Sequence, residues 1–378
     1  MIKILHAADI HLDSPFSLLD VKKAQARKSE LRGTFTSMML YAKTENYDIV
    51  LLPGDIFDNE YATKETMELM ISQFSQNPNC RFVISPGNHD PLTPKSPYRK
   101  VEFPPNVYLF ASEDVTKFSF DDIGVDVYGW AFLDAKKEEN PLRRGRIELD
   151  RDKINILSVH ADMTSADSVN CPMTEADIAD SGFDYVALGH IHAGGEVKKA
   201  GHTYYAYSGC LEGRSFDECG QKGAIVCKIN AASGGGHTEF TFGQKRFARR
   251  RYEKGAVDVS ETTETEEVVQ KIKTLIKNHA MGDDTLLRLR LFGTVTPTWK
   301  IDMSALTAQA FGLYYLEVRD ESLPVLDHGE LMNDISIRGA FYRELLPKLK
   351  SENAEERRIA AAALRYGLST LAGNDVEI

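Results

Sequence analysis

The first part of the chain alternates short apolar runs with longer amphipathic stretches. The strand-like runs "MIKILHAAD", "DIVLLPGD" and "RFVISPGNHD" are separated by helical patterns over 23–43 and 63–75. This alternation is typical of strands that are covered by helices. From about residue 101 short strands predominate, and a glycine-rich stretch at 230–237 predicts the turn of a hairpin. The pattern favours an α/β fold of two packed β-sheets flanked by helices over a single doubly wound sheet.

The pattern changes near residue 250, where we place a domain boundary. The segment "SETTETEEVVQKIKTLIKNHA" joins a Ser/Thr/Glu cluster to the apolar spacing of an amphipathic helix. The strand-like runs "TLLRLRLFG" and "LYYLEVRD" follow, with a helical stretch near 303–311 between them, and two more helical stretches end the sequence. The predicted organisation is an α/β domain at 1–250, a small α+β capping domain at 251–335, and a helical tail at 336–378.

The composition is that of an ordinary soluble protein with a sizeable core. Of 378 residues, 42% are hydrophobic and 27% are charged. The five cysteines show no C-x-x-C spacing, which disfavours a disulfide framework or a zinc knuckle and favours a cytoplasmic location. The beginning of the sequence does not resemble a signal peptide, and no long apolar stretch follows, so we expect no membrane association. The net charge of −11 repels nucleic acid at long range, so such a partner requires a local basic patch or bound cations.

Polar residues follow five of the strand-like runs. They are Asp9 and His11 in "ADIH", Asp55 in "PGDIFD", Asn88 and His89 in "PGNHD", His160 in "SVHAD", and His190 and His192 in "LGHIH". Neighbouring strands of an α/β sheet deliver the residues at their carboxyl ends to one edge, so we expect these side chains to converge. Imidazole, carboxylate and amide donors without a thiolate suit Mn²⁺, Fe²⁺ or Zn²⁺ better than Ca²⁺. The donors exceed what one ion uses, which predicts two bridged ions, a hydroxide held between them, and hydrolysis of a phosphoester.

The motifs D-x-H, G-D-x-x-D, G-N-H-D, H and G-H-x-H, in this order, resemble the calcineurin-type metallophosphoesterase superfamily from residue 1 to about 230. The resemblance implies a four-layer sandwich with two metal ions. By the family pattern one ion is held by Asp9, His11 and His192, the other by Asn88, His160 and His190, and Asp55 bridges them. The same pattern implies that His89 is not a ligand and instead protonates the leaving oxygen or stabilises charge on the phosphoryl group.

Other polar residues near these motifs have simpler interpretations. We expect Asp58 to fix the ring of His89, with a role as a surface cap as the alternative. Asp90, Asp13 and Asp162 are predicted to form turns rather than bind metal. The remaining histidines are predicted to stand outside the site, and they are His6, His202, His237, His279 and His328.

Within the superfamily, "HAADIHLDSPF", "PGDIFD" and "YYAYSGCLEGRSFDECGQKGAIVCKI" are similar to SbcD-like DNA repair exonuclease subunits, especially their YhaO-type branch. One position departs from the pattern, because Asp13 stands where many SbcD-like proteins have glycine. The resemblance implies a manganese-dependent nuclease acting on duplex DNA ends, a second domain that caps the site, and self-association into a homodimer. It also implies an SbcC-like ABC-type ATPase partner, since no G-x-x-x-x-G-K-[ST] motif occurs in this sequence.

Two segments could meet these partners. The stretch "QKRFARRRYEK" carries Arg246, Arg249 and Arg251, which are candidate contacts to DNA phosphates, although a strand with a solvated basic face explains them equally well. The apolar stripes of the tail helices fit either docking on a coiled coil or packing on their own domain.

Three functions remain open on sequence grounds. The first is the DNA exonuclease subunit, and the second is a phosphoesterase for small molecules, nucleotides or phosphoproteins with the same metal ligands. The third is a non-catalytic scaffold, which has no physical need for a complete ligand set.

Overall fold

The structure of the protein is a computed structural model that describes residues 1–59, 62–230, 238–296, 301–309, 311–325 and 327–371. The chain divides into two compact units, Met1–Arg251 and Tyr252–Ile378. The second unit contains both the predicted small α+β part and the predicted helical tail. The predicted glycine-rich turn lies outside the described residues, except for its first residue.

The first sheet of the first unit has six strands among the residues described. Their order is β12 (Glu239–Arg246), β11 (Gly223–Asn230), β1 (Ile2–His6), β2 (Ile49–Leu52), β3 (Arg81–Ile84) and β4 (Val107–Leu109). The strands β1 to β4 run parallel, whereas β11 pairs antiparallel with both β1 and β12. The β11–β12 pair is the predicted hairpin.

The second sheet also has six described strands. Their order is β5 (Thr116–Phe120), β6 (Val125–Gly129), β7 (Ile154–His160), β8 (Tyr185–Gly189), β10 (Thr203–Tyr207) and β9 (Lys198–Ala200). The four central strands are parallel, and the edge strands β5 and β9 pair antiparallel with their neighbours.

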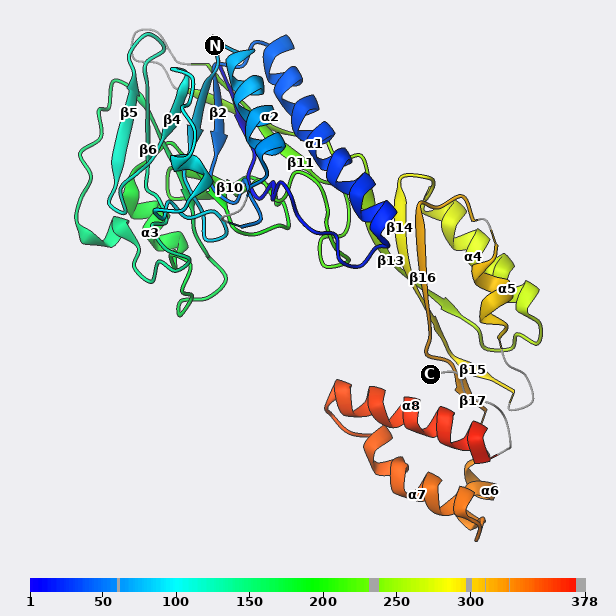
Figure 1. Ribbon diagram of the computed structural model, residues 1–378. Helices are drawn as coiled ribbons and strands as arrows, with labels where there is room; N and C mark the ends of the chain where they lie inside the picture. The colour runs from blue at the N-terminus through cyan, green and yellow to red at the C-terminus, as the bar shows by residue number, and fades with distance from the viewer. Residues whose placement is uncertain (60–61, 231–237, 297–300, 310, 326, 372–378) are drawn as a thin grey trace. The chain divides into compact units, whose positions relative to one another are not determined.

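The two sheets pack face to face and are covered by helices on their outer faces (Figure 1). Ile4, Ile49 and Val83 of the first sheet share a buried cluster with Val127 and Ile156 of the second. The alternate residues of the first sheet pack against α1 (Val21–Thr44) and α2 (Lys64–Ser75), and those of the second sheet pack near α3 (Glu175–Ser181). The period of two along each strand therefore builds four layers. The predicted fold class is confirmed.

The covering helices have clear local origins. The side chain of Asp20 accepts a hydrogen bond from the Lys23 backbone N at 2.9 Å and caps α1. The buried stripe of α1 comprises Leu31, Phe35, Met38, Met39 and Ala42. The short helix α3 was not predicted, although Thr174 and Asp177 form a capping box at its start. Two short 3₁₀ turns, η1 (Pro97–Arg99) and η2 (Pro141–Arg144), complete the helical elements of this unit among the residues described.

The second unit contains three-stranded and two-stranded sheets among its described residues, together with five helices. The strands are β13 (Arg251–Asp258), β14 (Thr285–Phe292) and β16 (Tyr315–Asp320) in one sheet, and β15 (Thr294–Val295) and β17 (Leu323–Pro324) in the other. The helices are α4 (Thr265–Asn278), α5 (Met303–Thr307), α6 (His328–Asn333), α7 (Ile337–Leu349) and α8 (Ala354–Leu371). Buried leucines of β14 pack with Val268 and Ile272 of α4. None of the helices in the described ranges is long and apolar enough to cross a lipid bilayer.

The apolar stripes of α7 and α8 pack on each other. Tyr342 and Leu345 of α7 form a buried cluster with Leu364 and Leu368 of α8, which Leu331 of α6 joins. The sequence left two interpretations open for these apolar stripes, docking on a coiled coil or packing on their own domain. Burial of these residues within the second unit corresponds to packing on their own domain.

Candidate metal centre

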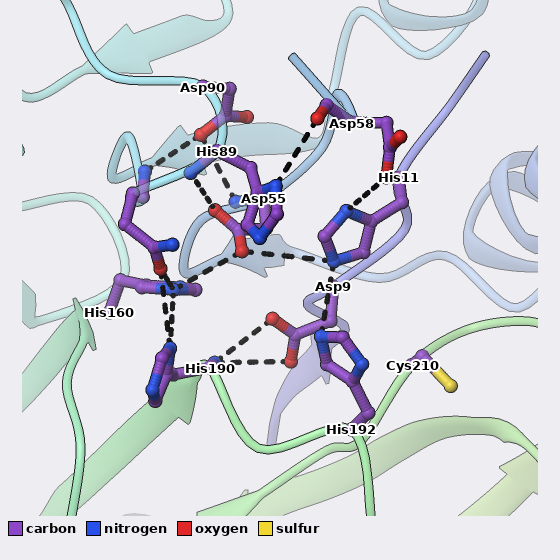
Figure 2. Close-up of polar contacts among 12 residues, drawn as sticks. Asp9, His11, Asp55, Asp58, His89, Asp90, His160, His190, His192 and Cys210 are labelled. Atoms are coloured by element: carbon purple, nitrogen blue, oxygen red, sulfur yellow. Dashed lines mark hydrogen bonds and ion pairs between the residues drawn. The ribbon is translucent and has the colours of Figure 1, made fainter. Parts of the chain in front are cut away.

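Polar residues at or just after the carboxyl ends of β1, β2, β3, β7 and β8 converge, and Figure 2 shows their side chains. We call Asp9, His11 and His192 the Asp9 side, and Asn88, His160 and His190 the Asn88 side. Backbone bonds tie the loops together, with Asp9 N donating to Gly54 O at 3.2 Å and His11 N to Asp55 O at 3.0 Å. The convergence follows from parallel strands that end together.

On the Asp9 side, two imidazole nitrogens face each other. The Nε2 atoms of His11 and His192 are 3.2 Å apart. One ligand atom from each of Asp9, His11, Asp55 and His192 lies within 4.8 Å of all the others. Asp9 is fully buried, and its two carboxylate oxygens also accept the backbone N–H of His190 at 3.0 and 3.2 Å.

On the Asn88 side, an amide oxygen and two ring nitrogens point at one another. Asn88 Oδ1 lies 2.8 Å from His160 Nε2 and 3.3 Å from His190 Nδ1, and the two ring nitrogens are 3.3 Å apart. His160 is fully buried, and 18% of the His190 side chain is exposed.

Asp55 stands between the two sides (Figure 2). Its Oδ2 lies 3.7 Å from His11 Nε2 and 3.4 Å from His160 Nε2, so one oxygen faces both sides. Its Oδ1 accepts the backbone N–H of His89 at 3.0 Å.

The backbone is strained where it presents these donors. Asp9, His11, Asp55 and His190 have φ values of 50°, 50°, 53° and 110°, in the region that non-glycine residues rarely adopt. Each such residue costs on the order of 1–3 kcal/mol, and such strain clusters at functional sites. Gly54 provides the room for His160, because a Cβ on Gly54 would lie 2.3 Å from His160 Nδ1.

The electrostatics of the cluster suit divalent cations. Burial and the charge of Asp55 raise the pKa of Asp9 well above its usual range, and burial also raises the pKa of Asp55. Burial lowers the pKa of His160 to about 4, so its imidazole is neutral at pH 7 and keeps a lone pair for a ligand. Adjacent buried carboxylates facing neutral imidazoles are costly alone, and bound cations offset that cost. The donor set therefore fits two ions that share Asp55.

Comparison with known families gives a match over the part of the chain that carries these donors. The model of the family described as calcineurin-like phosphoesterase matches residues 2–194. The chain belongs to the calcineurin-like phosphoesterase family. As a member, it is a metal-dependent phosphoester hydrolase with a candidate two-metal centre, and the predicted superfamily is confirmed.

Two curated proteins are similar over most of this calcineurin-like chain. An uncharacterized metallophosphoesterase, YhaO of Bacillus subtilis, is 31% identical over 81% of this chain and 75% of its own length. The DNA double-strand break repair protein Mre11 of Methanopyrus kandleri is 23% identical over 72% of this chain and 62% of its own length. Among solved structures, a dimetal phosphatase from Danio rerio matches 60% of this chain and 92% of its own, with a TM-score of 0.38 and 9% identity.

The exposed ring of His89 lies beside the donor cluster of this phosphoesterase, with its centroid 4.9 Å from that of His11. Asp58 is in contact with this ring, as predicted, and the contact is made by its backbone carbonyl. His89 Nδ1 lies 3.2 Å from the backbone carbonyl of Asp58, while Asp58 Oδ1 lies 2.8 Å from Arg214 NH1 and 3.1 Å from His11 Nδ1. The guanidinium holds the carboxylate of Asp58, and the main chain of Asp58 contacts His89.

Asp90 closes the turn, as expected. Its buried carboxylate accepts backbone N–H groups from Gly87, Asp55, Ile56 and Phe57 at 2.7–3.2 Å. Through these bonds it joins the loop after β3 to the loop after β2 and so holds Asp55 in place.

Asp13 and Asp162 also act within loops. The carboxylate of Asp13 accepts from Arg32 and Thr66, each at 2.8 Å, and from Thr63. Its φ of 69° explains why glycine suits this position in the pattern that the sequence resembles. Asp162 accepts from Thr164 N at 2.7 Å and lies 3.6 Å from His190 Nε2.

The histidines assigned no role in the site lie away from the donor cluster where they are described. The ring of His6 is buried and lies 2.8 Å from Tyr185 Oη and 3.1 Å from Leu188 O. His328 Nδ1 lies 2.9 Å from Tyr342 Oη in the second unit. His237 lies outside the described residues.

Sequence reasoning missed two residues next to the centre, Arg214 and Glu218. Glu218 Oε1 lies 2.7 Å from His192 Nδ1 and accepts from Arg214 NH2 at 2.8 Å. Both residues fall in "SGCLEGRSFDE", which carried the family resemblance, but their roles depend on a loop conformation that has no periodic pattern. The available signal for these two residues was an arginine and a glutamate four residues apart, downstream of the G-H-x-H motif.

The candidate DNA contacts are partly engaged within the first unit. Arg246 ends β12 and is exposed, and 67% of the Arg249 side chain is exposed, 3.5 Å from Glu30. Arg251 begins β13 and is half-buried. The backbone N–H of Arg249 donates to Glu212 Oε2 at 2.8 Å, which anchors this segment to the metal-centre unit.

Proposed function

We propose that this protein is a two-metal phosphodiesterase that degrades duplex DNA from its ends as the nuclease subunit of an SbcD-like complex. The complete donor set around Asp55, with the exposed His89 beside it, is the observation that carries the hydrolytic part of the proposal. When bound, two divalent ions supply stabilisation of charge on the phosphoryl group. Mn²⁺ is the ion we expect, since the resemblance to SbcD-like nucleases implies it, and the imidazole, carboxylate and amide donors also suit Mn²⁺.

In this proposal His89 serves as the general acid. A carbonyl oxygen can only accept a hydrogen bond, so the contact with the Asp58 carbonyl places a proton on His89 Nδ1. The imidazolium then holds its second proton on Nε2, from which it can pass to the leaving oxygen of the cleaved phosphodiester. The exposed position of His89 leaves that nitrogen accessible to a large substrate.

The DNA part of the proposal is supported by sequence similarity and by the exposed arginines. The match to Mre11 covers 72% of 378 residues, which is more than the 251 residues of the first unit, so it includes part of the second unit. Arg246 and Arg249 present positive charge on a protein whose net charge is −11. An SbcC-like ATPase partner and a homodimer complete the proposal, which predicts co-purification with a coiled-coil ATPase and a dimer mass in solution.

The test compares substrates that differ in one feature at a time. The purified protein with Mn²⁺ is assayed on linear and closed circular duplex DNA, on bis(p-nitrophenyl) phosphate and on p-nitrophenyl phosphate. We expect linear DNA to be degraded faster than circular DNA, and the diester to exceed the monoester in kcat/KM. Equal or better turnover of the monoester would instead support a small-molecule phosphoesterase. Absence of all hydrolysis by Mn²⁺-loaded protein would support the scaffold.

A further inference from the structure

Arg214 links two carboxylates behind the Asp9 side. Its NH1 donates to Asp58 Oδ1 at 2.8 Å and its NH2 to Glu218 Oε1 at 2.8 Å, while its backbone N donates to Glu218 Oε2 at 2.7 Å. Only 14% of the Arg214 side chain is exposed. A planar fork of donors between two carboxylates is an arrangement that arginine provides and lysine cannot reproduce.

Each of these carboxylates faces the outer nitrogen of one imidazole. Glu218 Oε1 lies 2.7 Å from His192 Nδ1, and Arg214 NH2 lies 3.1 Å from the same nitrogen. Arg214 NH2 also donates to Glu218 Oε1, and because an ionised carboxylate only accepts, the shorter contact with Glu218 places the proton on His192 Nδ1. His192 Nε2 is therefore left with its lone pair, on the side where it meets His11.

Asp58 has the corresponding place behind His11. Asp58 Oδ1 lies 3.1 Å from His11 Nδ1, at hydrogen-bond distance but with an unfavourable angle. The position of Asp58 relative to His11 thus depends on Arg214, which holds the same oxygen.

The Asn88 side has no equivalent arginine among the described residues. His160 Nδ1 lies 3.0 Å from the backbone carbonyl of Pro53, and His190 Nε2 lies 3.6 Å from Asp162 Oδ2, beyond hydrogen-bond distance.

We propose that Arg214 is a positioning residue that acts through Asp58 and Glu218 to fix the orientation of His11 and His192, and so strengthens metal binding on the Asp9 side alone. The inference rests on the two-metal centre of the proposed function and goes beyond it by assigning the loop 211–218 a role. Partners of metal-bound histidines typically contribute about 10–100-fold in metal affinity.

The loss of Arg214 should change the affinity for Mn²⁺ in opposite directions, depending on whether the residue acts by positioning the ligands or only through its charge. Removing a positive charge near the centre would by itself favour a divalent cation. If positioning dominates, Arg214→Met must bind Mn²⁺ more weakly despite its more negative surroundings. Arg214→Lys keeps the charge but loses the fork, so it should recover only part of the affinity.

The experiment titrates the metal-free full-length protein with Mn²⁺ and follows free and bound ion by electron paramagnetic resonance. For Arg214→Met we expect one of the two ions to bind about 10–100-fold more weakly and the other to keep its affinity. At Mn²⁺ concentrations where the wild type shows a spin-coupled pair, the variant should show an isolated ion. Glu218→Gln should weaken the same ion, and the double variant should lose less than the product of the single losses, because the two residues act as one unit.

The inference would be overturned if Arg214→Met bound Mn²⁺ with unchanged or higher affinity, or if both ions were weakened equally. It would also be overturned if the losses of affinity in the double variant were multiplicative. Circular dichroism of each metal-free variant checks the fold, and Glu218→Gln carries the test if Arg214→Met does not fold. Arg143→Met is the matched control, since Arg143 pairs with Asp177 at 2.7 Å away from the centre. If the wild type binds no Mn²⁺, the proposed function itself fails, which is a distinct result.

Discussion

The two sides of the metal centre use similar ligands but differ in what stands behind them. The Asp9 side has a carboxylate and two imidazoles, and behind the imidazoles stand Asp58 and Glu218, joined by Arg214. The Asn88 side has a neutral amide and two imidazoles, and His160 rests on a backbone carbonyl. Two sides with the same number of ligands therefore need not bind their ions with equal affinity. The residues of the surrounding loops set the local charge and the orientation of the ligand side chains.

Asp55→Ala should have the largest effect, because it removes the oxygen that faces both sides. We expect hydrolysis to fall to background and both ions to be lost, as measured by turnover of a diester substrate and by elemental analysis. Asp152→Ala, at an exposed carboxylate, should leave both readings unchanged. Two retained ions in the Asp55 variant would contradict the bridging assignment.

His89→Ala should separate catalysis from metal binding. The ring is exposed, its Nδ1 lies 3.2 Å from the Asp58 carbonyl, and the family pattern does not use it as a ligand, so both ions should remain. Turnover should fall by about 10²–10⁴-fold, which is typical for the loss of a general acid. His202→Ala, at an exposed histidine outside the centre, serves as the matched control. Loss of metal from the His89 variant would show that the residue is a ligand.

Replacing one ligand on each side tests the asymmetry directly. A unit charge pair about 4 Å apart contributes about 4 kcal/mol at an effective dielectric of about 20, and a neutral amide has no such term. Asp9 also accepts the backbone N–H of His190, so its loss disturbs both sides. We therefore expect Asp9→Ala to weaken Mn²⁺ binding more than Asn88→Ala in calorimetric titrations. The opposite ranking would refute the stronger role given to the Asp9 side.

Acid should destabilise the metal-free protein through the Asn88 side. The pKa of His160 is lowered from 6.5 to about 4, so between these values the unfolded chain binds the proton and the folded chain does not. The contribution of neutral His160 to the free energy of unfolding is then fully present above about pH 6.5. It declines by about 3 kcal/mol as the pH falls toward 4. Denaturant unfolding at several pH values should show a shallower decline in His160→Gln. An unchanged decline in that variant would mean that His160 is already protonated in the folded state.

The fold and the donor set could be predicted because both follow from regular strands. Runs such as "IVLL" fix where a strand ends, and the residues after it, such as Asp55, must then lie at the shared edge. Asp90 was also placed correctly, since a carboxylate after Gly-Asn-His is suited to closing a turn.

The rest could not be predicted because it depends on loops that have no hydrophobic period. The carboxylate of Asp58 pairs with Arg214, which stands more than a hundred residues later in the sequence, and no local pattern marks that contact. Glu218 reaches His192 by the same route. The short helix α3 was missed because only Ile178 among its residues is buried, so it has too little apolar spacing to recognise.

The most direct test of the account is an anomalous-scattering map from crystals of the wild-type protein grown with Mn²⁺. The account predicts two manganese peaks on either side of Asp55, one beside Asp9, His11 and His192 and the other beside Asn88, His160 and His190. A single peak, or peaks away from Asp55 under saturating Mn²⁺, would contradict a two-metal centre in this protein.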